Sequence, residues 1–184
     1  MLMILTALSL LAPLGSEVEL SPVFDVFVQE NYKDDQSADD ELKLGFNGDN
    51  AARSFLTFDT SELSGRQIGS AVLKLWNHHS WSCEARTWEV WGAEPATSKT
   101  RWPGPAMTTL YAASTQTLGY GDCADGWVEA DVSELAQSWA DAKAKLGSLA
   151  LKAGDEEDKM GWKRFASSED EEHGPVLEVA FEDD

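Results

Sequence analysis

The sequence is poor in basic residues: 14 lysines and arginines stand against 33 aspartates and glutamates, a formal net charge of −19. A surface with this charge repels phosphate backbones and anionic lipid headgroups. The composition therefore argues against nucleic acid as a partner and against binding to a membrane surface. It suits solubility, or a salty or calcium-rich exterior.

The sequence also lacks a hydrophobic run long enough to cross a bilayer. The longest apolar stretch, Leu2 to Leu14, has the length of a signal-peptide core, but no Lys or Arg precedes it and no A-x-A pattern follows. Residues 1–22 are therefore taken as a leader-like segment, either a signal remnant or a trimmed start inside a longer reading frame. The folded domain is expected over residues 23–182, with no membrane insertion.

Motifs for catalysis and nucleotide binding are missing as well. The sequence has no G-x-S-x-G elbow, no H-E-x-x-H and no glycine-rich phosphate loop. A strand would direct the neighbours His78 and His79 to opposite faces, so this pair does not predict a zinc site. The many acids make some close carboxylate pair inevitable, which leaves no specific signal for glycoside hydrolysis. The sequence predicts a protein that is not an enzyme.

Oxygen ligands for a structural calcium ion are present in two acidic runs. The first run holds Asp34, Asp35 and Asp39, and the second holds Asp155, Glu157 and Asp158. Neither has the spacing of an EF-hand loop. No cofactor is predicted beyond such an ion.

Cysteine is limited to Cys83 and Cys123, each beside strand-like sequence. A bridge between them would close a loop of roughly 40 residues and stabilise the fold by on the order of 4 kcal/mol in the chain-entropy model. Two separate buried thiols are the alternative. The even count favours a disulfide and an oxidising, extracellular compartment.

Short segments with period-two alternation dominate the rest of the chain. They predict strands over residues 23–29, 42–46, 53–59, 68–76, 85–93, 115–120, 127–132, 148–153, 161–166 and 176–181. Residues 94–114 are predicted to be irregular because Pro103-Gly104-Pro105 forbids regular pairing. One helix is predicted over residues 132–140, with Leu135 and Trp139 on its apolar face. The pattern predicts an all-β fold of about ten antiparallel strands and one short helix, arranged as a sandwich or barrel.

The sequence contains eight tryptophans, whose flat faces can stack on the apolar C–H faces of sugars. Five fall on predicted strands or on the helix and are expected in the core: Trp76, Trp88, Trp127, Trp139 and Trp162. The other three are candidates for a sugar-binding platform: Trp81 and Trp102 in loops, and Trp91 opposite Trp88. Their alternative role is to anchor a loop over an end of the fold.

An ordered set of segments resembles the DNRLRE domain, also classed as carbohydrate-binding module family 96. It spans about residues 23–182 and comprises FDVFV (24–28), RSFLTFD (53–59), IGSAVLKL (68–75), TRWPGP (100–105), WVEADV (127–132) with Trp139, and WKRF (162–165) with PVLEV (175–179). The resemblance implies a non-catalytic jelly-roll β-sandwich attached to extracellular proteins, some members binding polysaccharides such as alginate. The SWSC and RWPGP segments are similar to a subgroup in large secreted or surface proteins of actinobacterial type, including YD-repeat shells.

The expected function is a secreted or cell-surface, non-catalytic polysaccharide-binding module. The alternative is a structural packing module of a large secreted or YD-repeat surface protein, and a glycan-active enzyme is the least favoured. The partners are therefore polysaccharide or the modules of a parent surface protein. Sugar contact is predicted to centre on Trp102 with Trp91 or Trp81, and Arg101 or Arg86 would add polar or charge contacts because arginine offers a planar fork of donors.

Overall fold

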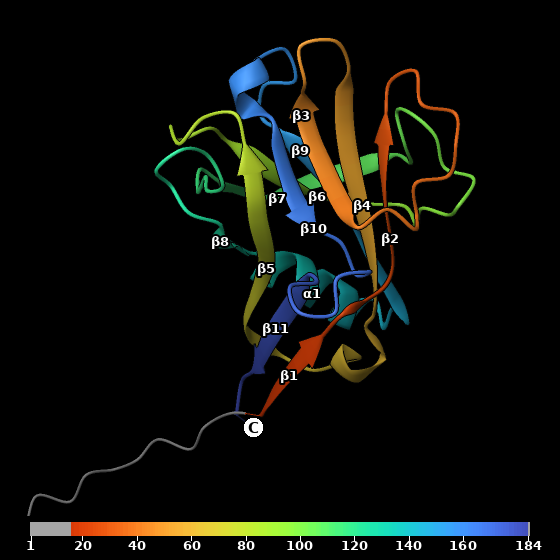
Figure 1. Cartoon of the computed structure of the whole chain (residues 1–184). Coiled ribbons are helices and arrows are strands. Elements are labelled where there is room, and N and C mark those ends of the chain that lie inside the picture. The colour runs from red at the N-terminus through yellow and green to blue at the C-terminus, as the bar shows by residue number, and fades with distance from the viewer. Residues whose placement is uncertain (1–15, 184) are drawn as a thin grey trace, which may run out of the picture.

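The structure is a computed structural model that describes residues 16–183, and strands account for most of its regular elements. The strands are β1 (Glu17–Leu20), β2 (Pro22–Gln29), β3 (Glu41–Phe46), β4 (Ala51–Asp59), β5 (Ile68–Ser80), β6 (Trp88–Ala93), β7 (Met107–Ser114), β8 (Gly126–Asp131), β9 (Leu146–Ala153), β10 (Lys163–Ala166) and β11 (Val176–Phe181). The helices are α1 (Ser133–Asp141) and the 3₁₀ turns η1 (Ser61–Leu63) and η2 (Lys159–Gly161). Figure 1 shows their arrangement.

The strands form a curled antiparallel sheet whose two halves pack face to face. In one half, the β5 sheet, β5 pairs with β11 and then β10 along one edge and with β8 along the other, and β1 extends β11. The other half, the β4 sheet, has the order β2-β4-β9-β6-β7. Strand β3 joins the halves, because it pairs with β10 and, at its end, with β4. The predicted all-β antiparallel sandwich is confirmed.

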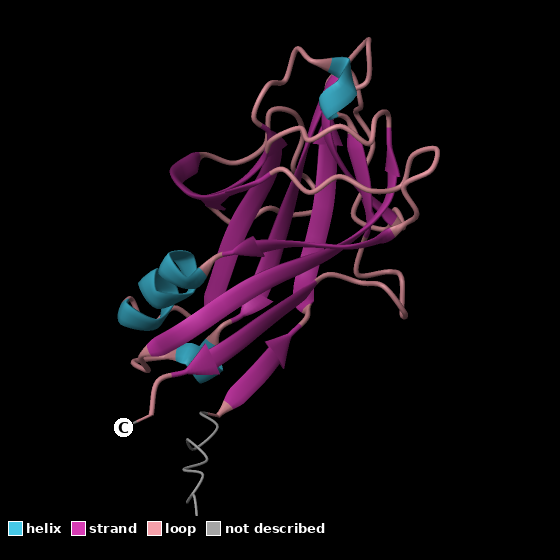
Figure 2. Cartoon of the chain, turned by 90° about the vertical axis from the view of Figure 1, so that its left-hand side faces the viewer, coloured by secondary structure: helices cyan, strands magenta, loops and turns pink. Residues whose placement is uncertain are grey.

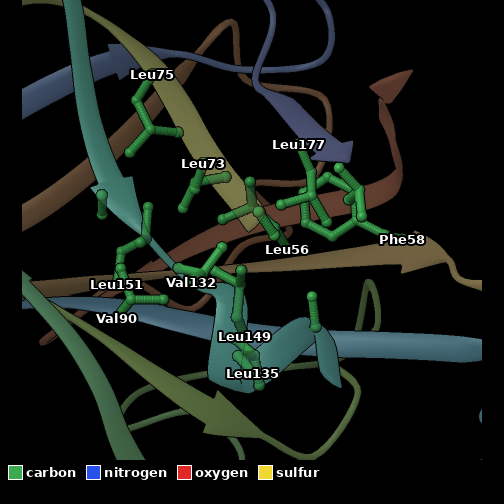
Figure 3. Close-up of a cluster of buried hydrophobic side chains, with 14 of the residues drawn as sticks. Leu56, Phe58, Leu73, Leu75, Val90, Val132, Leu135, Leu149, Leu151 and Leu177 are labelled. Atoms are coloured by element: carbon green, nitrogen blue, oxygen red, sulfur yellow. The ribbon is translucent and has the colours of Figure 1, made fainter. Parts of the chain in front are cut away.

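The core lies between the two halves, where each strand contributes every second side chain. Leu73 and Leu75 of β5 face Leu56 and Phe58 of β4, and all four are fully buried (Figure 3). Burial of such side chains provides about 1.5–3 kcal/mol each relative to exposure. The alternation visible in the sequence therefore sets which face of each strand points inward.

A second apolar layer covers the outer face of the β4 sheet. Val26 and Val28 of β2, Phe55 of β4 and Ala150 of β9 are buried there together with Ala96, which belongs to the loop of residues 94–106. We call this group the outer cluster. The loop is thus packed against the sheet over an apolar surface, although it has no regular secondary structure of its own.

The predicted helix is confirmed as α1, near the end of the sandwich that carries the C-terminus (Figure 2). Leu135 and Trp139 are buried, as the helical spacing indicated. Ser133 Oγ accepts a hydrogen bond from Ala71 N at 2.9 Å, and Gln137 Oε1 accepts one from the backbone N–H of Ile68 at 2.8 Å. These two bonds attach the helix to the first residues of β5. No helix in residues 16–183 has the length and apolar character of a membrane span.

Apart from shifts of up to four residues at strand ends, three segments differ from the sequence prediction. Residues 17–20 were predicted to belong to the leader-like segment, but they form β1 and pair with β11. Residues 1–15 of that segment lie outside the described residues. Residues 107–114, predicted irregular, form β7, because the effect of the prolines ends before Met107. Residues 115–120, predicted as a strand, cross an end of the sandwich, where Asn77 Oδ1 accepts a hydrogen bond from Leu118 N at 2.9 Å in place of a strand partner.

The predicted disulfide between Cys83 and Cys123 is confirmed. It joins the loop after β5 to the loop before β8. These loops lie at the same end of the sandwich as residues 115–120, so the disulfide ties that irregular segment to the long central strand.

Candidate functional site

The structure places two of the predicted platform tryptophans on the outer face of the β4 sheet. Trp91 lies on β6 and Trp102 in the loop of residues 94–106, and both are half-buried against the outer cluster. The inner face of β6 is filled by Trp88, which is fully buried. The opposite orientation of Trp88 and Trp91 that the alternation indicated is therefore present.

A strip of charged side chains lies between these two tryptophans and contacts both rings. It consists of Arg53, Glu156, Lys152 and Glu89. The Arg53 guanidinium lies 4.6 Å from the centroid of the Trp102 ring and donates two hydrogen bonds of 2.7 Å to the Glu156 carboxylate. Lys152 Nζ lies 3.9 Å from Glu156 and 3.7 Å from Glu89. Each cation and each carboxylate of this strip thus has a partner within the chain. A sugar could stack on the face of Trp102 that Arg53 covers only after displacing that side chain.

Trp102 is also held by its own loop. Gly104 has a φ of +88° and lies directly over the Phe55 ring, so close that a Cβ there would overlap it. The Arg101 guanidinium donates to the backbone carbonyls of Lys33, Ser98 and Thr100 at 2.6–2.9 Å. Arg101 therefore holds the loop in place, through three hydrogen bonds that its guanidinium makes to backbone carbonyls of the chain.

Trp81 and Arg86, the remaining predicted contact residues, lie apart from the outer cluster. Trp81 packs beside buried Trp162, with ring centroids 6.3 Å apart. Arg86 lies between Glu84 and Asp158, with hydrogen bonds of 2.8 and 2.9 Å, and lines a cleft of about 390 Å³. Glu89 lines the same cleft, so Arg86 approaches the charged strip at its Trp91 end. That the five predicted residues bind sugar stays a prediction.

Two other tryptophans that the sequence placed in the core lie on the outer face of the β5 sheet instead. Leu73 and Leu75 of β5 point into the core, and Trp76 points to the opposite, outer face because side chains alternate along a strand. Trp127 of β8 is the cross-strand partner of Trp76. Trp76 is half-buried and Trp127 is 37% exposed. The prediction is wrong for this pair because Trp76 alternates with the buried leucines of β5 and Trp127 is its cross-strand partner. Trp88, Trp139 and Trp162 are buried as predicted.

Trp76, Trp127 and His173 form a group that we call the aromatic platform. The Trp76 and Trp127 rings meet edge to face with centroids 5.5 Å apart, and the His173 ring lies 4.1 Å from that of Trp76, inclined by 31°. Lys74 Nζ lies over the Trp127 ring, 5.9 Å from its centroid, which is close to the outer limit of about 6 Å for a cation–π contact. Trp127 is thus more open than the half-buried Trp102, whereas the His173 ring covers one face of Trp76.

Depressions lie at both ends of the platform. The Trp76 cleft, about 180 Å³, is lined by Asp40, Glu41, Trp76, His78, Ala166 and Asp170. The Ser70 groove, about 240 Å³, lies where β1, β11 and the first part of β5 meet, lined by Glu17, Val18, Glu19, Ser70, Val72, Glu178, Val179 and Ala180. Both are open to solvent and bordered by hydrogen-bonding side chains.

Two acids of the Trp76 cleft, Glu41 and Asp170, have a pKa below the usual value. Burial raises the pKa of Glu41, but Arg164 at 3.3 Å and Lys43 at 3.2 Å outweigh it, so that the pKa lies below its usual value. Hydrogen bonds from the backbone N–H groups of His173 and Glu172 lower the pKa of Asp170. These carboxylates can accept hydrogen bonds from a ligand, and they repel anions.

Four of the six acids in the runs predicted to hold calcium have partners within the chain. Asp35 accepts a hydrogen bond from Ser37 N, Asp39 from Glu41 N, and Asp155 from Glu157 N, each within its own turn. Asp158 pairs with Arg86. In residues 16–183, no group of three or more His, Cys, Asp or Glu side chains has a metal-binding arrangement.

The comparison with known families gives one match over nearly the whole chain. The model of carbohydrate-binding module family 96 matches residues 16–181. The match begins one residue before β1 and ends at the last residue of β11, so it covers the complete sandwich. No curated protein matches the sequence.

Proposed function

We propose that this chain, which belongs to carbohydrate-binding module family 96, binds polysaccharide through the aromatic platform on the outer face of the β5 sheet. The observation that carries the proposal is the exposure of Trp127 beside Trp76, with open depressions on either side. Sugar rings stack their apolar C–H faces on such rings, and their hydroxyls need hydrogen-bonding groups at the rim. Lys74, His78 and Asp170 are of the right kind for that rim.

The proposed role is binding without catalysis. A glycosidase of the common kind needs one carboxyl with a raised pKa to protonate the leaving group. Beside the platform, Glu41 and Asp170 both have a lowered pKa. Burial raises the pKa of Asp25, but that carboxyl is 3% exposed and accepts a hydrogen bond from Ser168 N. Glu41 and Asp170 suit recognition of hydroxyl groups rather than proton transfer to a glycosidic oxygen, and Asp25 is buried away from the surface.

The proposed location is secreted or at the cell surface. Two features support it: the disulfide between Cys83 and Cys123, which persists in oxidising compartments, and the family to which the chain belongs. In that setting the module would hold a parent protein, or an attached enzyme, on its polysaccharide.

A packing module of a larger surface protein is the second candidate function, because the strand at one edge of the sandwich carries no charged side chain. From Trp102 to Gly121 the sequence contains no charged residue, although charged residues make up 26% of the chain. Within this run, β7 pairs with β6 along one edge only among the described strands, and Leu110 is 44% exposed. An uncharged edge strand is a surface to which a neighbouring module could pair.

Affinity electrophoresis of two matched tryptophan variants tests the proposal. Trp127→Ala should lose retardation in gels containing the bound polysaccharide and keep its melting temperature within a few degrees, because the ring lies on the outer face of the β5 sheet and belongs to neither buried cluster. Trp102→Ala should bind normally and melt at a lower temperature, because Trp102 packs on the outer cluster. If Trp102→Ala loses retardation and Trp127→Ala keeps it, the site lies at Trp102 and Trp91 instead. If no glycan retards the wild-type chain, the packing module is favoured.

A further inference from the structure

We infer that the ligand of the aromatic platform is a linear polysaccharide without acidic groups, which lies along β5 and contacts both depressions. The inference rests on the proposed function and adds the direction and the chemical class of the ligand. It follows from the spacing of the outward side chains of β5 and from the charges around them.

The outward side chains of β5 form one continuous line on the surface. Ser70, Val72, Lys74, Trp76 and His78 succeed one another at every second position, and at about 3.3 Å per residue this line extends about 26 Å. We call it the β5 band. Figure 1 shows β5 running along the sandwich, with β8 on one side and β11 and β10 on the other. A surface of this shape fits an extended chain better than a single sugar unit.

Each end of the β5 band leads into one of the two depressions. Ser70 and Val72 line the Ser70 groove, whereas Trp76 and His78 line the Trp76 cleft. Lys74 lies between them, and Trp127 stands beside Trp76, toward the cleft end of the band. A chain stacked on Trp76 and Trp127 would therefore enter the cleft at one end and the groove at the other.

The charges along the β5 band oppose an acidic ligand. Six carboxylates line the two depressions: Glu17, Glu19 and Glu178 in the groove, and Asp40, Glu41 and Asp170 in the cleft. The nearby cations are already paired, since Lys74 Nζ lies 2.8 Å from Glu178 and Arg164 lies 3.3 Å from Glu41. A polyanion would meet an excess of like charge at the surface, in addition to the net charge of −19. Neutral sugars and amino sugars avoid this cost.

The cations on the other sheet do not provide a site for an acidic chain either. Arg53 and Lys152 lie within 4 Å of Glu156, and Arg86 pairs with Glu84 and Asp158. A sugar carboxylate would have to displace one of these acids. The charge pairing therefore disfavours acidic polysaccharides on both outer faces.

A panel of defined polysaccharides tests the chemical class. The wild-type protein is run in affinity gels with neutral hydroxyethylcellulose and glucomannan and with anionic alginate, and chitosan binding is measured by pull-down. Retention by a neutral polymer or by chitosan, with no retention by alginate at low ionic strength, is expected. Preferential retention by alginate would overturn the inference but leave the proposed function standing. Binding to none of the four polymers would overturn both.

Calorimetry with oligosaccharides of increasing length, taken from the polymer that is retained, tests the direction along β5. Affinity should rise with length until the chain covers both depressions. Ser70→Ile, which fills the groove, should weaken binding of the longest oligosaccharide about tenfold and leave the shortest unchanged. Ser98→Ile, an exposed position on the loop over the other sheet, is the matched control. Equal affinity at every length, or no effect of Ser70→Ile, would show that the ligand does not lie along β5.

Discussion

Trp76 and His173 stack on each other with ring centroids 4.1 Å apart and planes inclined by 31°. Trp76 lies on the central strand β5, and His173 comes from the loop between β10 and β11, so their contact places a loop residue on the outer face of a rigid sheet. The histidine covers one face of the Trp76 ring and limits how that ring can turn. It is therefore a positioning residue for the surface on which we expect sugar to stack.

His173→Ala should weaken polysaccharide binding, because Trp76 would lose the ring that orients it. His173→Phe should restore most of the affinity, since a phenyl ring can make the same stacked contact, worth about 0.5–1.5 kcal/mol. Titration calorimetry of both variants against the retained polysaccharide measures the difference. If Phe fails where Ala fails, the imidazole acts through its nitrogens and not through stacking.

Gly104→Ala should destabilise the fold by about 1–3 kcal/mol, because the new methyl group would overlap the Phe55 ring. Gly121→Ala is the matched control: its φ is also positive, at +57°, but nothing lies within 4 Å of the position that a Cβ would take. The difference between the two variants in urea unfolding isolates the contact from the backbone cost. Equal losses would mean that the loop over the outer cluster can move aside.

Much of the fold could be predicted from the sequence, because strand alternation and helical spacing are local signals. Leu73 and Leu75 alternate with Lys74 and Trp76, and Leu135 and Trp139 lie one helical turn apart. Residues 115–120 show where this fails. They alternate like a strand, but their backbone groups bond to the side chain of Asn77, to Ser80 at the end of β5 and to loop residues, which no local pattern reveals.

The candidate site was harder to predict, because it depends on residues distant in sequence. The phase of Trp76 relative to Leu75 indicated an outward ring, and this signal was available. The contact with His173 and the two depressions depend on how β8, β11 and the loop before β11 surround β5. Likewise, only the folded arrangement shows that Arg53 covers Trp102 and that Arg101 binds backbone carbonyls.

Trp139→Ala should destabilise the protein by about 3–5 kcal/mol, in the range for truncation of buried tryptophan. The ring is 8% exposed, packs 6.5 Å from the Phe58 ring and lies against Gly147, where a Cβ would clash with it. Denaturant unfolding of the purified variant measures the loss. A cost under about 1 kcal/mol would show that α1 does not contribute its apolar face to the core.

Lys163 on β10 is expected to make stability depend on pH in the alkaline range. Its side chain is fully buried, and its Nζ donates a 2.6 Å hydrogen bond to Thr117 Oγ1. Burial, with a smaller contribution from the positive charge of Arg86, lowers the pKa of Lys163 from 10.5 to about 8. The charged form is thus penalised in the folded state and not in the unfolded state.

The sign follows from which state holds the proton. Below about pH 8 Lys163 is protonated in both states, so the penalty for the buried charge is present in full. Between about pH 8 and 10.5 the folded state releases the proton while the unfolded state keeps it, so stability should rise with pH, by at most about 1.4 kcal/mol per unit. Lys163→Met should remove this rise, whereas Lys99→Met, at an exposed position, should keep it. Urea unfolding at intervals from pH 7 to 10 gives the slopes, and identical slopes for wild type and Lys163→Met would show that the buried ammonium carries no such penalty.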